Sequence, residues 1–286
     1  MKEKEKVAVF DTTLRDGEQA AGTRLGSREK LTLARQLARL NVDILEAGYP
    51  ASSPEDFQAV ELISREIERP IICALSRAVP SDIEACGKAL AKARRPRIHT
   101  GIGVSDIHIT GKFRDDKYGR TLGEKKVKLV KMAVDAVKLA RSFADDVEFY
   151  AEDSGRAEPA YLFEMLEAAI DAGATVVNIP DTTGYTVPEQ FGALIRSIRE
   201  KVPNIGRATI SVHCHDDLGL AVANTLAGVR NGARQVEGTI NGIGERAGNA
   251  ALEEVVMALR TRGDYFGVKT DIEAREFHRT SRLVAD

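Results

Sequence analysis

The chain has 286 residues, of which 43% are hydrophobic and 29% charged, and this suits one large domain or two ordinary ones. Its formal net charge of -2 gives no reason to expect a nucleic acid or an anionic membrane as a partner. Three cysteines without a CxxC pair favour a reducing, cytoplasmic setting over a disulfide framework. No apolar run approaches the roughly 20 residues of a membrane-spanning helix.

Short β-branched runs alternate with longer amphipathic stretches along the chain. The first run follows a charged start and is too short for the core of a signal peptide, so we interpret it as a strand. The runs that predict strands are 7–10, 42–48, 70–75, 97–104, 146–151, 175–180, 208–215 and 235–241. Apolar residues at intervals of three and four predict helices with one buried face, among them 27–40, 159–173, 188–202 and 249–262.

Eight strands, each followed by a helix, predict an α/β fold with a parallel sheet. An open doubly wound sheet could use eight strands, but eight units in about 250 residues are what a closed (β/α)8 (TIM) barrel needs. We therefore expect a catalytic barrel over residues 1–268, with the irregular insertion 105–123 covering one mouth as a lid. Residues 269–286 predict one more helix, which we interpret as the start of a linker or subdomain beyond this chain.

The first strand ends in the polar segment DTTLRDGEQ, residues 11–19. In a barrel, functional groups collect at the C-terminal ends of the strands. The charged residues of this turn are Asp11, Arg15, Asp16 and Glu18. A solvated loop is the plain alternative. The functional interpretation is a metal-binding carboxylate beside a guanidinium that stabilises developing negative charge.

The seventh strand ends in the sequence HCHDD, with histidines at positions 213 and 215. Side chains alternate across a strand, so His213 and His215 share one face while Cys214 points to the other. Two imidazoles about 7 Å apart along a strand can both reach one metal ion. A single histidine would more often be a core residue, but two on one face at a barrel mouth predict a metal site.

The eighth strand leads into NGIGERAGN, residues 241–249. Gly242, Gly244 and Ala247 match the dinucleotide-binding pattern, but that pattern belongs in the first unit of a Rossmann half, and here it opens the last helix. Glycines that let the backbone fold close over the site are the better interpretation, with Asn249 offering a side-chain oxygen. Two nitrogen and two oxygen donors suit Zn²⁺, Mn²⁺, Co²⁺ or Mg²⁺, and they come from Asp16, His213, His215 and Asn249.

Four other strand ends also carry side chains on the predicted site face. By alternation, these are Leu75, His99, the pair Tyr150 and Glu152, and the set Asn178, Pro180 and Thr182. Core packing would explain Leu75 and Tyr150 equally well. It explains Glu152 poorly, because an unpaired buried carboxylate is costly.

Four long segments resemble the DRE-barrel metal-dependent lyases and synthases, namely DTTLRDGEQ, NIPDTTGYTVP, SVHCHDDLGLAVANTLAG and VEGTINGIGERAGN. The likeness runs along nearly the whole chain, and within that group it is greatest to the 2-isopropylmalate synthases. It implies an acyltransferase of leucine biosynthesis that condenses acetyl-CoA with 3-methyl-2-oxobutanoate and releases 2-isopropylmalate and CoA. It also implies a homodimer with small-molecule substrates only.

The resemblance implies roles for the residues that match the family's motifs. The residues that match the family's metal ligands are Asp16, His213 and His215, with Asn249 as an accessory ligand. Catalytic roles fall on Arg15, which stabilises the oxyanion, and on Glu152, which lines the acetyl site. Thr182 matches the residue that binds the substrate carboxylate, and the pocket for the alkyl group is matched by Leu75, His99, Asn178 and Pro180. Groups from C-terminal subdomains complete the family's site, so binding without full turnover is expected of residues 1–286.

Tyr150 departs from the family pattern. Isopropylmalate synthases tend to carry a small residue there, and a tyrosine resembles the citramalate synthases, which take pyruvate. Loss of room for a methylene shifts selectivity by about 1–3 kcal/mol. His99 and Asn178 match the isopropylmalate pattern, which we favour. A lyase of the same group, cleaving a 3-hydroxyacyl-CoA, is a further alternative.

Overall fold

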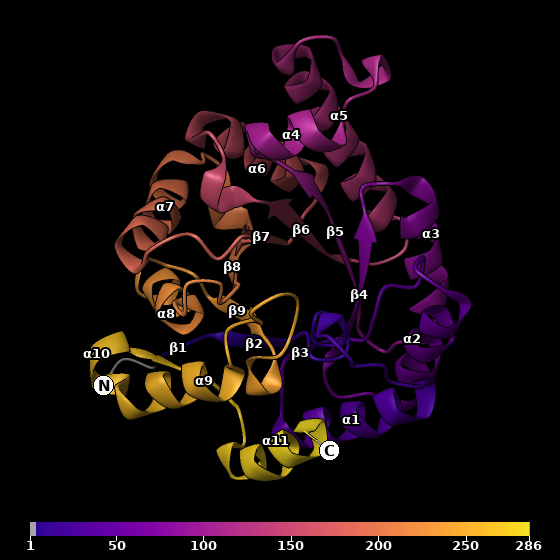
Figure 1. The fold of residues 1–286 in the computed structure, drawn as a ribbon, viewed down its shortest axis with the longest axis vertical. Coiled ribbons are helices and arrows are strands. Elements are labelled where there is room, and N and C mark those ends of the chain that lie inside the picture. Colours follow the sequence, from indigo (N-terminus) through magenta and orange to yellow (C-terminus); the bar gives the residue numbers. More distant parts are fainter. Residues whose placement is uncertain (1–3, 286) are drawn as a thin grey trace.

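The eight predicted strands close into a parallel barrel in the computed structural model, which describes residues 4–285 (Figure 1). The strands pair in chain order and β2 closes on β9, which confirms the barrel over the open sheet. Their bounds are β2 (Ala8–Asp11), β3 (Ile44–Glu46), β4 (Ile71–Arg77), β5 (Pro96–Gly103), β6 (Asp146–Glu152), β7 (Val176–Asp181), β8 (Thr209–Cys214) and β9 (Gln235–Gly238).

A ring of helices covers the barrel, and their ends follow local capping chemistry. They are α1 (Ser27–Leu40), α2 (Pro54–Glu66), α3 (Pro80–Ala89), α5 (Leu122–Arg141), α6 (Pro159–Ala172), α7 (Pro188–Lys201), α8 (Ala221–Arg230) and α9 (Leu252–Thr261). Proline opens α2, α3, α6 and α7, where a missing backbone N–H costs nothing. Gly173 ends α6 in the left-handed conformation that glycine adopts without strain.

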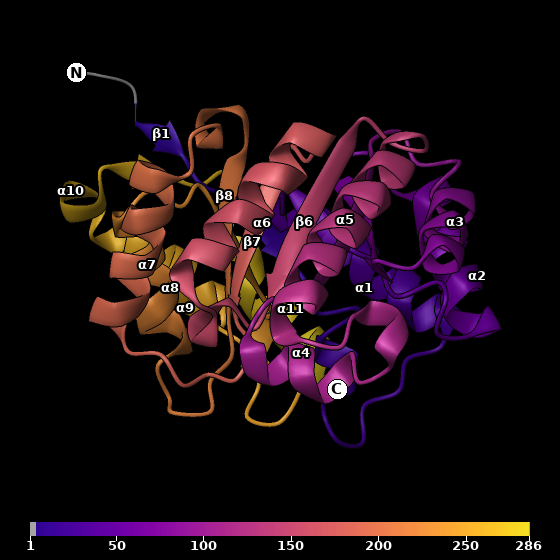
Figure 2. The ribbon, with the colours of Figure 1, turned by 90° about the horizontal axis from the view of Figure 1, so that it is seen from above.

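Two sequence predictions about helices are wrong in detail. The segment 105–123 is not irregular: it contains α4 (Asp106–Lys112), capped by Ser105, and the short turn η2 (Asp116–Tyr118). Figure 2 shows α4 at the same end of the barrel as the loops that follow β2, β8 and β9. The last barrel helix begins at Leu252 rather than 249, because Asn249 and Ala251 form bridges with strand-end residues before the chain can coil.

The last segment of the chain returns along the outside of the barrel. After α10 (Gly263–Phe266), strand β10 (Val268–Lys269) pairs with β1 (Glu5–Lys6), and η6 (Ala274–Glu276) then leads into α11 (Phe277–Ala285). Helix α11 lies beside α1, where the buried amide of Gln36 donates to Glu276 and to Thr280. The predicted terminal helix therefore packs on the barrel itself. That residues 269–286 open a further subdomain stays a prediction.

The main apolar core lies between the barrel and its helices, not inside the barrel. A second, small apolar cluster is formed by Phe10, Ile44 and Cys73. Phe10 packs its ring against His99, with 5.7 Å between centroids. Fully buried charged groups inside the barrel include Glu46, Glu148 and Glu237. All three cysteines are free and buried. Among residues 4–285, no helix is long and apolar enough to cross a membrane.

Replacing Gly101 by alanine should destabilise the barrel. A Cβ at Gly101 would overlap the carbonyl oxygen of Tyr150 and lie 2.5 Å from Tyr150 Cγ, so β5 and β6 could pair only by shifting. We expect Gly101→Ala to cost about 1–3 kcal/mol. The matched control is Gly123→Ala in the first turn of α5, where nothing lies within 4 Å of the added carbon. Thermal unfolding midpoints that are equal for the two variants would contradict this account.

Candidate functional site

Asp16, His213 and His215 converge at the mouth of the barrel. His213 Nε2 lies 3.4 Å and His215 Nε2 4.0 Å from Asp16 Oδ2, and the two imidazole centroids are 5.0 Å apart. All three residues are at most 6% exposed. One ligand atom from each lies within 4.8 Å of the others, so the three residues could hold one metal ion between them.

Local structure brings each ligand to this point. His213 lies inside β8, and His215 continues the extended chain to bridge Asn249, so both rings lie on the same face as the alternation predicts. Asp16 follows a tight turn in which its amide donates to the carbonyl of Thr12. The turn is fixed by Asp11, whose carboxylate accepts hydrogen bonds from the amide and hydroxyl of Thr13.

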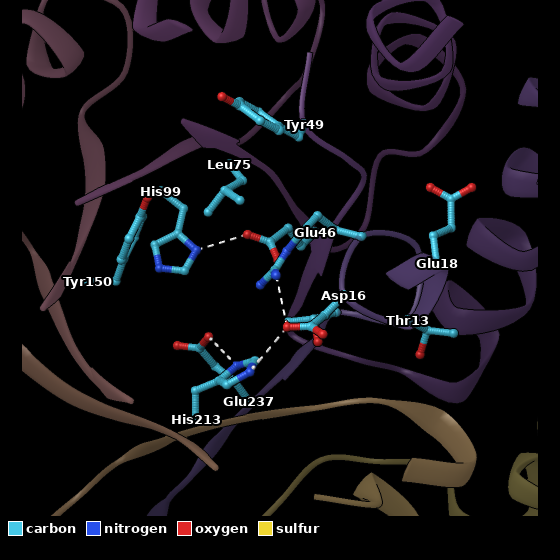
Figure 3. A network of polar contacts seen from close by, with 12 residues as sticks. Thr13, Asp16, Glu18, Glu46, Tyr49, Leu75, His99, Tyr150, His213 and Glu237 are labelled. Carbon is cyan, nitrogen blue, oxygen red and sulfur yellow. Dashed lines mark hydrogen bonds and ion pairs between the residues drawn. The ribbon is translucent and has the colours of Figure 1, made fainter. Parts of the chain in front are cut away.

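The four charged residues of segment 11–19 do not act as one group. Asp11 supports its own turn, and Glu18 points away from the cluster towards Lys30, with 2.6 Å between the charged atoms (Figure 3). Only Arg15 and Asp16 face the barrel axis. Arg15 and Asp16 therefore lie side by side as predicted, whereas Asp11 and Glu18 make structural contacts elsewhere.

Asn249 lies directly against the cluster. Its amide nitrogen donates to Asp16 Oδ1 at 3.0 Å, while its Oδ1 is buried without a hydrogen-bond partner among residues 4–285. A buried amide oxygen without a donor is costly, and a divalent cation at the cluster would supply the missing partner. Gly244 permits this approach, because a Cβ there would overlap the Asn249 amide and lie 3.1 Å from Asp16 Oδ1. The donor set thus fits a divalent metal ion.

The pKa values of the three clustered residues are shifted in different directions by burial and by their neighbours. Burial opposes ionisation of Asp16, but Arg15 and His213 hold the pKa of its carboxyl well below the usual range. Burial also lowers the pKa of His213, yet its bonds to Asp16 and Glu237 raise it to about 9. Burial and the neighbouring His213 lower the pKa of His215 to about 3. A cation binding here would therefore compete with a proton mainly at His213.

Arg15 is fixed by two carboxylates. Its Nε donates to Glu46 Oε2 at 2.6 Å and its Nη1 to Asp16 Oδ2 at 2.8 Å. The other oxygen of Glu46 accepts from His99 Nδ1 at 2.8 Å, as Figure 3 shows. Glu46 is completely buried and therefore aligns Arg15 and His99 at the same time.

Sequence reasoning missed Glu46 and Glu237. His213 Nδ1 lies 3.2 Å from Glu237 Oε2, a pairing that fixes the ring and leaves Nε2 facing Asp16. A signal was available for both residues. Each is a lone carboxylate at a strand end, and the cost of burying such a group, which drew attention to Glu152, applies equally to Glu46 and Glu237.

Leu75, His99, Tyr150 and Asn178 lie on neighbouring strands in matching register. Leu75 pairs with His99, and Tyr150 with Asn178. The Tyr150 ring meets His99 edge-on at 5.0 Å, and its hydroxyl donates to the carbonyl of Ser76 at 3.1 Å. These four residues form one wall of the barrel mouth. Asn178 Oδ1 is buried without a hydrogen-bond partner among the described residues, so this wall has an acceptor that is free to bind a ligand.

The remaining predicted residues lie at or just beyond the C-terminal ends of β6 and β7. The Glu152 carboxylate is 3.5 Å from both His108 Nε2 and Lys112 Nζ, which come from α4. Thr182 Oγ1 accepts a hydrogen bond from the backbone of Asp153 at 2.9 Å. Pro180 is buried and pairs in register with His213. Glu152 thus lies against α4, and Thr182 is hydrogen-bonded to the backbone that follows β6.

Fold and site together define a (β/α)8 barrel with a buried carboxylate–histidine cluster at its C-terminal mouth. The family model described as HMGL-like matches residues 6–284. The chain therefore belongs to the HMGL-like family.

Curated relatives give a finer comparison. The 2-isopropylmalate synthase of Thermosynechococcus vestitus is 56% identical over 99% of this chain and 54% of its own length. Those of Aquifex aeolicus and Pyrococcus furiosus are each 56% identical over 98% of this chain and 52% and 54% of their own lengths. The chain spans about half the length of the curated relatives it matches.

Solved structures support the fold. The hydroxymethylglutaryl-CoA lyase of Pseudomonas aeruginosa aligns with a TM-score of 0.78 at 18% identity, covering all of this chain and 94% of that one. The HMG-CoA lyase of Brucella melitensis aligns with a TM-score of 0.76 at 19% identity, covering 98% of each chain. At this identity the likeness shows a shared barrel and nothing about substrate.

Removing one imidazole should abolish metal binding. We expect His213→Ala to lose the ion, because Asp16 and His215, with Asn249 as accessory, cannot replace the complete set of donors. Metal content after exchange with Mn²⁺ and gel filtration measures this. The control is His278→Ala, at an exposed position on α11. Wild-type metal content in His213→Ala would remove the ligand assignment.

Proposed function

We propose that this chain is the catalytic barrel of an acyltransferase that condenses acetyl-CoA with 3-methyl-2-oxobutanoate, giving 2-isopropylmalate and CoA. The observation that carries the proposal is the buried Asp16–His213–His215 cluster with the Arg15 guanidinium 2.8 Å from Asp16. Relatives at 56% identity named 2-isopropylmalate synthase support the choice of reaction. A homodimer with small-molecule substrates is part of the same proposal.

In this proposal, Asp16, His213 and His215, with Asn249 as accessory ligand, hold a divalent ion such as Zn²⁺, Mn²⁺, Co²⁺ or Mg²⁺. A bound ion would polarise the keto group of the 2-oxo acid. Arg15 stabilises the negative charge that develops on the former keto oxygen, and its clamp between Glu46 and Asp16 aims it in advance. No reorientation of the guanidinium is then needed during reaction.

Substrate positioning is proposed for the surrounding wall. Thr182 binds the substrate carboxylate, and Glu152 lines the acetyl site beneath α4. The alkyl group rests against Leu75, His99, Asn178 and Pro180. A base takes a proton from the acetyl methyl group, the methyl carbon bonds to the keto carbon, and the former keto oxygen takes up a proton. Water then cleaves the thioester, which gives a carboxylate and free CoA.

Tyr150 motivates a second candidate, in which pyruvate replaces the branched oxo acid and the product is citramalate. Its ring lies beside His99 on the wall proposed to receive the alkyl group. A narrower pocket would disfavour the isopropyl substituent by about 1–3 kcal/mol per methylene-sized loss of room. The relatives' names favour the branched substrate, so we retain 3-methyl-2-oxobutanoate.

Release of the CoA thiol should distinguish the two substrates. We expect faster release with 3-methyl-2-oxobutanoate than with pyruvate from a form extended to the length of the relatives. Residues 1–286 alone should bind the 2-oxo acid in a calorimeter with little turnover. Preference for pyruvate would reverse the substrate assignment. Products formed without net thioester hydrolysis would favour a lyase instead.

Loss of Arg15 should separate binding from chemistry. Arg15→Ala should keep its metal ion but turn over about 10²–10³-fold more slowly, because a preorganised donor to developing charge is gone. Metal content and CoA release in the extended form measure the two effects. Arg279→Ala, exposed on α11, is the control and should behave as wild type. Unchanged turnover in Arg15→Ala would contradict the role given to Arg15.

A further inference from the structure

A continuous chain of buried hydrogen bonds runs from the metal-ligand cluster down through the barrel interior. It begins at Glu237, whose Oε2 pairs with His213 Nδ1 and whose Oε1 accepts from the Ser211 hydroxyl at 2.6 Å. Ser211 Oγ in turn accepts from Gln235 Nε2 at 2.9 Å. These three residues come from two adjacent strands, β8 and β9.

Gln235 is anchored below by an ion pair. Its Nε2 also donates to Glu148 Oε1 at 2.8 Å, and its Oε1 accepts from Arg97 Nη1 at 2.8 Å. Arg97 Nη1 donates to Glu148 Oε2 at 2.9 Å, and its Nε to Asp146 at 2.9 Å. Gln235 therefore cannot rotate without breaking bonds to both of these partners.

Register explains why these groups form a stack. Ser211 pairs with Gln235 and His213 with Glu237 between β8 and β9, so alternate residues place two layers on the inward face. Ser211, Glu148 and Glu237 have no exposed surface, and Gln235 and Arg97 are at most 5% exposed. Water therefore does not compete for these bonds, and each donor must be satisfied within the stack.

The bonding pattern is more specific than core filling requires. Apolar side chains of similar volume would fill a barrel interior at lower desolvation cost. Here one oxygen of Glu237 accepts from the imidazole N–H and the other from the Ser211 hydroxyl, and the carboxyl group of Glu148 also contacts Glu237. A carboxylate held in this way fixes both the tautomer and the rotation of the ring, which directs Nε2 of His213 towards Asp16.

We propose that Ser211 and Gln235 are positioning residues that act through Glu237 to hold His213 ready for a divalent cation, with Arg97 and Glu148 as their anchor. The proposal rests on the metal site proposed above and is independent of the substrate. It predicts that residues remote from the ion tune its affinity.

Titration of residues 1–286 with Mn²⁺ in a calorimeter tests the proposal, together with the visible absorption of Co²⁺. Ser211→Ala should weaken Mn²⁺ binding by about 10-fold, as loss of an outer-shell partner typically does, and should shift the Co²⁺ bands. The matched control is Ser76→Ala, the same change at an equally buried strand position whose hydroxyl contacts the carbonyl of His99 at 3.5 Å and the Cys86 thiol, far from Glu237 in the hydrogen-bond chain. Ser211→Thr retains the hydroxyl and should restore affinity.

Two results would overturn the proposal while leaving the metal site intact: wild-type affinity and spectrum in Ser211→Ala, or equal weakening in Ser76→Ala. If Ser211→Ala does not fold, Glu237→Gln serves instead. It retains an oxygen for the His213 N–H but loses the charge, so Mn²⁺ should bind about 10- to 100-fold more weakly. Unchanged affinity in Glu237→Gln would overturn the proposal. No Mn²⁺ uptake by the wild type would overturn the metal assignment and, with it, this inference.

Discussion

The structure depends on buried charged groups that neutralise one another without help from water. Asp16 is almost fully buried, and Arg15, His213 and His215 surround it. Removing one partner from a buried ion pair typically costs about 3–5 kcal/mol, because the other charge is left unpaired. Each charge near Asp16 is therefore tied to a second one, Arg15 to Glu46 and His213 to Glu237. The site is thus built largely from linked pairs.

The barrel supplies the rigidity that such linked pairs need. Four of the side chains lie on strands β3, β5, β8 and β9, namely Glu46, His99, His213 and Glu237. Alternation along each strand turns them to the barrel interior and leaves little freedom in their positions. The rest lie just outside the strands. The turn after β2 carries Arg15 and Asp16, His215 directly follows β8, and the glycine-rich segment after β9 brings Asn249 into contact with Asp16. Apolar packing is mostly moved outward, between strands and helices, and this frees the interior for polar groups.

Much of this could be predicted from the sequence. Periodicity predicted all eight strands, most of them within two residues of their ends, and helices α1, α6 and α7 nearly to the residue. Residue types at strand ends predicted that Asp16, His213 and His215 lie together. Helix α4 was missed because its segment is short, polar and without a strong apolar stripe. Glu46 and Glu237 were missed for another reason. Their partners are 31 and 24 residues away in the chain, and only the pairing of neighbouring strands shows which cationic side chain each carboxylate meets.

The pairing of β2 with β9 joins the first and last strands of the barrel, and the proposed metal ligands come from both sides of that seam. Asp16 and Asn249 are 233 residues apart, yet they touch. A half-folded barrel cannot assemble this set of donors, so an ion that prefers the complete set would favour the closed ring over every partly open one. By mass action, free metal at about 100 times its dissociation constant would add about 2.7 kcal/mol to the stability of the closed ring. A bound ion would thus stabilise the closed barrel as well as take part in the reaction.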